Sequence, residues 1–234
     1  MIKEKNMFGT SYTNSNWRSA SEINGAMTRV YGHMSLAVIV SMIVSHFVGT
    51  SPELLQFFFT GALKWVVIFA PLVAMFGIMF VLEKVGKIGA QLLLYSFAAL
   101  MGLSFATIFA IFTMGSIASA FMGAAVMFGT MSFYGYFTKR DLTSLGQFMI
   151  VGLIAIIIAS IINIFIGNAL VQLVISALAI IIFLGLTAYD TQKIREDLMH
   201  DSGPVAEIRG ALTLYLDFIN LFIHLLQLIG IKKE

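Results

Sequence analysis

The sequence predicts an all-α membrane protein with seven transmembrane helices. Of its 234 residues, 59% are hydrophobic and only 11% are charged, and the mean hydropathy is +0.93. A soluble domain usually contains about 25% charged residues. The apolar residues form seven stretches of the roughly 20 residues that a helix needs to cross the hydrocarbon core of a bilayer. We therefore expect the lipid bilayer to surround most of this chain.

Short connections separate the seven apolar stretches. The stretches cover residues 30–48, 62–82, 88–112, 117–137, 146–166, 169–190 and 205–229. Connections of a few residues predict that consecutive helices are antiparallel neighbours. The sequence thus divides into a polar N-terminal tail at 1–29, a transmembrane domain at 30–230 and a short C-terminal tail at 231–234.

The positions of the basic residues predict a cytoplasmic N-terminus, because positively charged connections tend to stay on the cytoplasmic side. With this orientation, 11 of the 14 basic residues lie inside. These are Lys3, Lys5, Arg18, Arg29, Lys84, Lys87, Lys139, Arg140, Lys193, Arg195 and Arg209. Lys64, Lys232 and Lys233 would lie outside. The last two leave two alternatives for the final stretch: a complete crossing, which the early basic connections favour, or a segment that re-enters and returns.

The residues that are missing exclude several classes of protein. The chain has no cysteine, which excludes disulfides, iron–sulfur clusters and thiolate zinc sites. No basic block is long enough to indicate nucleic-acid binding. No nucleophile motif, phosphate loop or metal-ligand spacing is present, so we expect neither an enzyme nor a cofactor. The acid in Leu216-Asp217-Phe218 also lacks the preceding glycine that is typical of intramembrane aspartyl proteases.

Asp217 lies near the middle of the last apolar stretch. A carboxylate at the centre of a transmembrane helix costs roughly 2.5–3.5 kcal/mol, so it normally faces a partner or a water-filled cavity. At about 100° per residue, four further polar residues share its face of the helix. These are Thr213, Asn220, His224 and Gln227. Such a stripe predicts a helix that turns it toward other helices or a passage. For Asn220 and Gln227, the alternative is simple hydrogen bonding between helices.

Asp190 ends the sixth apolar stretch. It is either a capping or interfacial residue, or a second buried acid. If Asp190 meets Asp217, two negative charges are costly in a medium of low dielectric constant, so the pair would share one proton. The protonated pair would hold two helices together, whereas the deprotonated pair would repel itself and transiently bind a divalent cation such as Ca²⁺. Lys84, which closes the second stretch, would either neutralise Asp190 or act as an ordinary interfacial anchor.

The residues around the two acids resemble the Bax inhibitor-1 family, also called the transmembrane Bax inhibitor motif family. The strings that carry the resemblance are TAYDTQ at 187–192 and LYLDFINLF at 214–222, and the hydrophobic layout also fits from about residue 29 to residue 230. The compact connections look like the bacterial branch, whose members lie in the inner membrane. The resemblance implies a seven-helix fold whose last helix is central and surrounded by the other six.

The resemblance also implies a function, because some members of this family are pH-sensitive calcium leak channels. In them, the acids that match Asp190 and Asp217 pair as the pH sensor, and a basic residue matching Lys84 pairs with the sixth-helix acid in the closed state. Well-studied relatives have arginine at that position, and lysine lacks its two-pronged geometry. Some members also carry an acid midway along the second helix, where this chain has only residues 70–73, Ala-Pro-Leu-Val.

A second hypothesis follows from the same resemblance. Some bacterial relatives modulate a membrane-anchored ATP-dependent protease. In that case the protein would be a regulator that binds this protease, and the polar N-terminal tail with Trp17 and Arg18 would be the natural contact.

Overall fold

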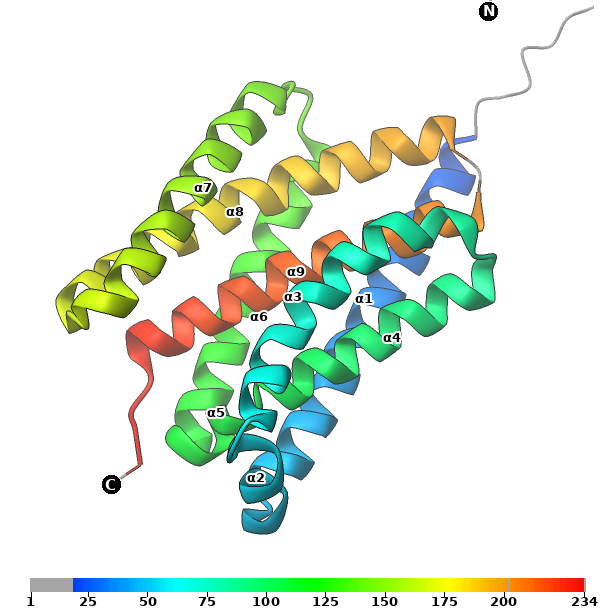
Figure 1. Ribbon diagram of the computed structural model, residues 1–234. Coiled ribbons are helices and arrows are strands. Elements are labelled where there is room, and N and C mark those ends of the chain that lie inside the picture. The colour runs from blue at the N-terminus through cyan, green and yellow to red at the C-terminus, as the bar shows by residue number, and fades with distance from the viewer. Residues whose placement is uncertain (1–18, 202, 234) are drawn as a thin grey trace, which may run out of the picture.

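The computed structural model describes residues 19–201 and 203–233, and all of its regular elements are helices (Figure 1). In chain order they are α1 (Ala20–Gly49), α2 (Pro52–Phe59), α3 (Leu63–Val81), the 3-10 helix η1 (Leu82–Lys84), α4 (Lys87–Ser104), α5 (Ala106–Ile111), α6 (Met114–Phe137), α7 (Thr143–Ile166), α8 (Ala169–His200) and α9 (Pro204–Ile229). Seven segments are long and apolar enough to cross a membrane, with α3 and η1 forming one and α4 and α5 another. The predicted fold class is confirmed.

The first helix begins ten residues before the apolar stretch. Ser19 caps α1: its hydroxyl accepts a hydrogen bond from the Glu22 N–H at 3.3 Å, and the Glu22 carboxylate accepts one from the Ser19 N–H at 2.7 Å. This reciprocal pair satisfies two backbone donors that the first turn of a helix leaves free. The polar segment from Ala20 to Arg29 is therefore helical, while Lys3, Lys5, Trp17 and Arg18 lie outside the described residues.

A short helix that the sequence analysis did not predict connects the first two spans. α2 starts with Pro52 in its first turn and Ser51 as its cap, and none of its residues is buried. Eight residues are too few to cross a bilayer. Lys64 lies over the ring of Trp65 directly after this helix, at 5.2 Å from the ring centroid. A lysine and a tryptophan at the start of α3 are typical anchors at a membrane surface.

A hydrogen bond connects the second and third spans near a proline. Pro71 lies within α3 and has no backbone N–H, so the carbonyl of Val67, four residues earlier, loses its helical donor. The Ser104 hydroxyl, at the end of α4, donates to this carbonyl at 2.5 Å. The helix of the third span is interrupted at the next residue, Phe105. A side chain from one span thus supplies the hydrogen bond that the proline removes from the other.

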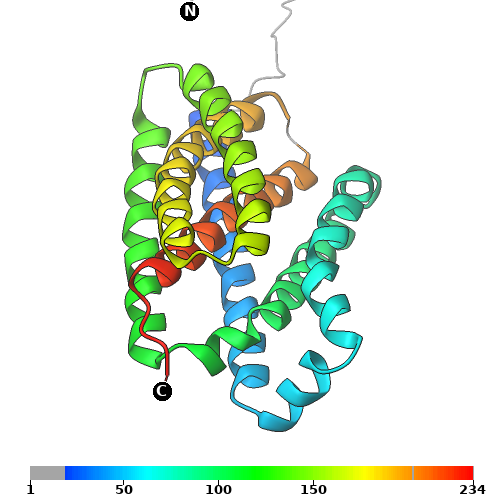
Figure 2. The same ribbon diagram turned by 60° about the vertical axis from the view of Figure 1, so that its left-hand side comes forward.

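The last helix is the most buried of the seven spans. α9 packs along α1, α4, α6 and α8, whereas α7 packs on α8. Figures 1 and 2 show α9 running through the middle of the bundle. α9 thus contacts four of the other helices, while residues of α3 and α7 line a cavity beside it. The implied arrangement, with all six other helices around the last one, stays a prediction.

The chain ends at the opposite end of the bundle from the start of α1 (Figures 1 and 2). We call these ends the N-terminal side and the C-terminal side. After α9, the tail pairs with the connection between α5 and α6: Thr113 N–H donates to the Ile231 carbonyl at 3.0 Å, and Lys233 N–H donates to the Ile111 carbonyl at 2.8 Å. α9 therefore runs the full length of the bundle, which agrees with a complete seventh crossing and not with a re-entrant segment.

Candidate functional site

A cavity of about 580 Å³ lies beside α9, between α3, α7 and α8. Its wall on α7 is mainly isoleucine and leucine, and α3 contributes Met75. Apart from Ser160 on α7, the polar lining comes from α8 and α9. These residues are Asp190, Thr213, Asp217, Asn220 and His224. The structure thus brings together five of the residues that the sequence analysis singled out.

The two acids face each other across the contact between α8 and α9. Asp217 is only 4% exposed, and its side chain lines the same cavity as that of Asp190. Asp217 Oδ2 is buried, and no N–H or O–H group of the described residues donates to it. A hydrogen bond between two carboxyl groups requires that one of them is protonated. The sharing of one proton by Asp190 and Asp217 stays a prediction.

Asp190 is not a capping residue in this fold. The sixth span was predicted to end at this position, but α8 continues for ten residues, to His200. The residue lies inside the helix, and its side chain is partly buried. Lys193, nearly one turn further along α8, lines a cavity together with Asp190.

A second, smaller cavity lies on the N-terminal side of the acids. It has a volume of about 190 Å³, and Asp190 and Thr213 line it as well as the larger cavity. Its other polar lining residues are Lys193, Asp197 and Arg209. Asp190 and Thr213 therefore separate a charged cavity at the end of the bundle from an acid-bearing cavity at its centre. The Thr213 hydroxyl donates its hydrogen to the Arg209 carbonyl at 3.2 Å, so toward the cavities it can act only as an acceptor.

Lys84 lies at the end of η1 and is exposed. Among the described residues, no ion pair joins it to Asp190, and its proposed pairing stays a prediction. The ion pairs at this point of the bundle involve Arg209 of α9. Its guanidinium binds the carboxylate of Glu83 in η1, and its Nη2 lies 3.1 Å from Oδ2 of Asp201. The sequence analysis missed this role of Arg209, since the residue was only counted toward the orientation.

Gln227 lies beyond the larger cavity, toward the C-terminal side. Its Oε1 accepts hydrogen bonds from Gln172 Nε2 at 3.0 Å and from the Ser176 hydroxyl at 2.8 Å. Gln172 in turn accepts a hydrogen bond from Asn163 at 3.3 Å. Gln227 therefore joins α9 to α8 and α7 and does not line the cavity.

The other two members of the polar stripe do line the cavity. Asn220 uses its amide N–H to donate to the Leu216 carbonyl of its own helix at 2.8 Å. The ring of His224 stacks on Phe183, with centroids 6.2 Å apart. His224 Nδ1 is buried and has no hydrogen-bond partner among the described residues. A buried nitrogen without a partner is costly, so the cavity beside it is suited to water or an ion.

The described residues contain no group of three or more histidine and acidic side chains that could hold a metal ion. A resident calcium site in a protein usually offers six to eight oxygen ligands, several of them from carboxylates. Asp190 and Asp217 supply two carboxyl groups, and transient binding of calcium by them stays a prediction.

The site and the fold together define a multi-pass membrane protein with a pair of acids inside the bundle. Comparison with known proteins identifies the family to which it belongs. Residues 23–234 match the family model described as inhibitor of apoptosis-promoting Bax1, and the chain belongs to this Bax inhibitor-1 family.

Two similar proteins come from bacteria. The chain is 36% identical over 214 residues to the inner membrane protein YbhL of Escherichia coli, covering 88% of this chain and 92% of YbhL. It is 35% identical over 212 residues to protein RP147 of Rickettsia prowazekii, covering 89% and 90% of the two chains. The seven spans and the name of the Escherichia coli relative support a multi-pass protein of the inner membrane.

Proposed function

We propose that this protein is a proton-gated leak for calcium ions across the inner membrane. The observation that carries the proposal is that Asp190 and Thr213 line both cavities. A cation in the larger cavity has the carboxyl groups of Asp190 and Asp217 within reach, and the smaller cavity beyond them leads to the N-terminal side. Asp190 therefore stands between the two cavities, and Asp217 lies on the wall of the larger one.

The protonation of the pair would control passage. With one proton, Asp190 and Asp217 hold α8 and α9 together through a hydrogen bond. Without it, two negative charges in a site of low dielectric constant repel each other and attract a divalent cation. The ion pairs of Arg209 with Glu83 and Asp201 hold η1 and the α8–α9 connection against α9, and we assign them the closing role that the resemblance gives to Lys84.

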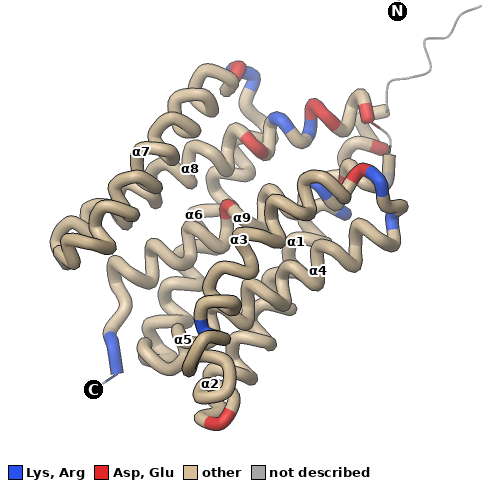
Figure 3. The backbone as a smooth tube through the Cα atoms, in the orientation of Figure 1, with Lys and Arg blue, Asp and Glu red and all other residues tan. Residues whose placement is uncertain are grey.

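The charge distribution favours placing the N-terminal side in the cytoplasm. Charged residues gather at that end of the bundle in Figure 3. Of the 11 described basic residues, eight belong to it and three to the C-terminal side. The eight are Arg29, Lys84, Lys87, Lys139, Arg140, Lys193, Arg195 and Arg209, and the three are Lys64, Lys232 and Lys233. Positive residues on short connections favour the cytoplasmic side.

Calcium flux into liposomes tests the proposal. Purified full-length protein is reconstituted around a calcium-sensitive dye, and flux is measured across a pH series. We expect Asp190→Asn and Asp217→Asn to abolish the pH dependence, because neither variant retains two titrating acids. Asp141→Asn, which removes an exposed acid outside the cavity, should leave the pH dependence unchanged. Flux that keeps its pH dependence in both cavity variants would show that Asp190 and Asp217 are not the pH sensor.

The second candidate function is a non-conducting regulator of a membrane-anchored ATP-dependent protease. The feature that favours it is the polar first third of α1, which extends beyond the apolar span and exposes Ser21, Asn24 and Thr28. Deleting residues 1–18 leaves the Ser19 cap of this helix intact. Loss of protease capture in this deletion, together with no calcium flux in liposomes, would favour the regulator over the leak.

A further inference from the structure

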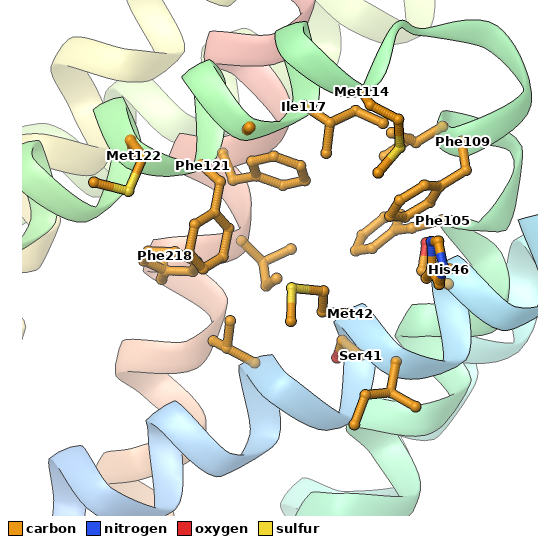
Figure 4. A pocket seen from close by; sticks show the side chains of 17 residues that line it. Ser41, Met42, His46, Phe105, Phe109, Met114, Ile117, Phe121, Met122 and Phe218 are labelled. Atoms are coloured by element: carbon orange, nitrogen blue, oxygen red, sulfur yellow. The ribbon is translucent and has the colours of Figure 1, made fainter.

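A second large cavity lies on the other side of α9. It has a volume of about 450 Å³ and is bounded by α1, α5, α6 and α9. Ligand pockets in proteins usually measure about 300–1,000 Å³. Figure 4 shows Phe121 and Phe218 at one end of this cavity and Phe105, Phe109 and His46 at the other. We call it the apolar cavity.

The apolar cavity is unsuited to water. Of its 17 lining residues, only Ser41, Ser45 and His46 are polar. The Ser41 hydroxyl already lies 2.7 Å from both the Ala98 carbonyl oxygen and the Tyr215 hydroxyl. A water molecule in a cavity needs two to four polar partners, and apolar cavities without them stay dry. An apolar molecule is therefore the fitting occupant.

The mouth of the apolar cavity opens between α1 and α6. Met42 and Ile43 on α1 and Met114 and Met122 on α6 line it, and all four side chains are exposed on the surface of the bundle. They belong to apolar spans, so this surface borders the hydrocarbon of the bilayer and not water. The molecules at the mouth are lipid acyl chains.

The depth of the apolar cavity matches one leaflet. Its lining on α1 runs from Val38 to His46, which is about 12 Å at 1.5 Å per residue. One leaflet contributes about 15 Å of the hydrocarbon core. His46 lies near the end of α1 on the C-terminal side, at the depth where a lipid chain meets its polar headgroup.

The apolar cavity also lies directly opposite the acids on α9. Phe218, Ile219 and Phe222 line it, whereas Asp217, Asn220 and His224 line the larger cavity. At about 100° per residue, these two sets occupy opposite faces of the helix. A molecule in the apolar cavity would therefore support α9 from behind the acid pair.

We propose that the apolar cavity is a binding site for one acyl chain of a phospholipid from the leaflet on the C-terminal side. The chain passes between Met42 and Met114, and its methyl end lies against Phe121 and Phe218. The site requires no conduction, so it stands whether or not the protein is a calcium leak.

Photochemical labelling in liposomes tests this site. The full-length protein is reconstituted with a phospholipid that carries a diazirine in the middle of one acyl chain, and labelled positions are mapped by mass spectrometry of peptides. We expect the lining segments around Met42 and Met122 to be labelled several times more strongly than Phe165, which is 85% exposed on α7. Equal labelling at these positions would mean that the cavity holds no chain and would overturn the proposal.

A filling variant gives the matched comparison. Ala118 lines the apolar cavity on α6, and in Ala118→Phe the added ring occupies the space of the chain. Labelling at Met42 should fall about tenfold, the loss expected from overfilling a packed site. Ala155→Phe adds the same ring to an exposed position on α7 and should leave labelling at Met42 unchanged.

A variant with a smaller added side chain controls for misfolding. Ala118→Leu should reduce labelling at Met42 less than Ala118→Phe does, and labelling at Phe165 in the same samples reports that the protein remains inserted. If Met42 is labelled equally in the native protein, Ala118→Leu and Ala118→Phe, the occupant is not a lipid chain.

Discussion

Arg29 of α1 donates two hydrogen bonds to Glu207 of α9, with Nε 2.8 Å from Oε2 and Nη2 2.6 Å from Oε1. The Glu207 side chain is 5% exposed and that of Arg29 is 51% exposed. The pair joins the first and last spans on the N-terminal side. This bidentate contact holds α9 against α1, and Glu207 does not line the larger cavity.

The first prediction concerns this pair. Arg29→Ala should lower the free energy of unfolding by about 1–3 kcal/mol, because it removes two charged hydrogen bonds to a buried carboxylate. Adding Glu207→Gln should cost less than the sum of the two single changes, since the charge that lost its partner is then gone. Unfolding in mixed micelles measures both effects, with Lys139→Ala as a control for loss of an exposed cation. Additive effects would show that the two side chains act independently.

The second prediction compares two glycines on one helix. A Cβ at Gly135 of α6 would lie 2.2 Å from the Ala188 carbonyl oxygen of α8, two residues before Asp190, whereas a Cβ at Gly129 has nothing within 4 Å. Gly135→Ala should force the helices apart and lower the melting temperature. Gly129→Ala should raise stability by about 0.5–1 kcal/mol, because alanine favours a helix over glycine. Equal melting temperatures for the two variants would contradict this account of α6–α8 packing.

The third prediction concerns the carbonyl freed by Pro71. Ser104→Ala removes the hydroxyl that donates to Val67 and should cost about 1–3 kcal/mol, the penalty for a buried acceptor without a donor. In Ser104→Ala/Pro71→Ala, the backbone N–H of residue 71 returns and can donate to the same carbonyl. The double variant should therefore unfold at a higher temperature than Ser104→Ala alone. A further loss of stability would show that Pro71 has a different role.

The fourth prediction concerns the hydrogen bonds beyond the larger cavity. Gln227→Leu keeps most of the side-chain volume but removes the acceptor for Gln172 and Ser176. If the leak proposed above operates, calcium flux should increase, because these bonds close the cavity toward the C-terminal side. Gln91→Leu on α4 is the matched control and should leave the flux unchanged. Flux that falls in Gln227→Leu would instead assign the glutamine to the ion path.

The fifth prediction concerns Asp141, in the connection between α6 and α7. Its Oδ1 accepts a hydrogen bond from the Thr143 N–H at 2.8 Å, and hydrogen bonds from Thr143 hold the pKa of Asp141 below its usual value. A lowered pKa contributes stability above the unfolded-state pKa, which is lost as the pH falls through the folded-state value. Asp141→Asn should therefore melt slightly below the native protein at neutral pH, and the difference should shrink as the pH falls below about 3.9 and vanish below the lowered folded-state pKa. A difference that persists in acid would not come from the charge.

The sequence predicted the spans well because hydropathy over 20 residues is a strong, local signal. The same averaging concealed α2, which is too short to cross, and the interruption at Phe105, where the residues on both sides are equally apolar. The polar face of α9 was also local information, since helical spacing alone placed Asp217, Asn220 and His224 together. The structure adds that Gln227 turns to α7 and α8 at the end of this face.

The ion pairs could not be predicted in the same way. Arg29 and Glu207 are 178 residues apart, and Arg209 and Glu83 are 126 apart. No spacing rule connects such positions, because the partner of a charge at the end of a helix depends on which helices become neighbours. The charges were visible in the sequence, but their partners follow only from the packing of α9 against α1 and η1.

The two cavities on opposite faces of α9 have a mechanical consequence. A helix with close-packed neighbours on all sides cannot shift sideways without overpacking. α9 has about 580 Å³ of space on one face and about 450 Å³ on the other, so it can move toward either face and reduce the void there. High hydrostatic pressure favours states with less internal void. Pressure and the thickness of the bilayer should therefore change the position of α9 between the two cavities, even at constant pH.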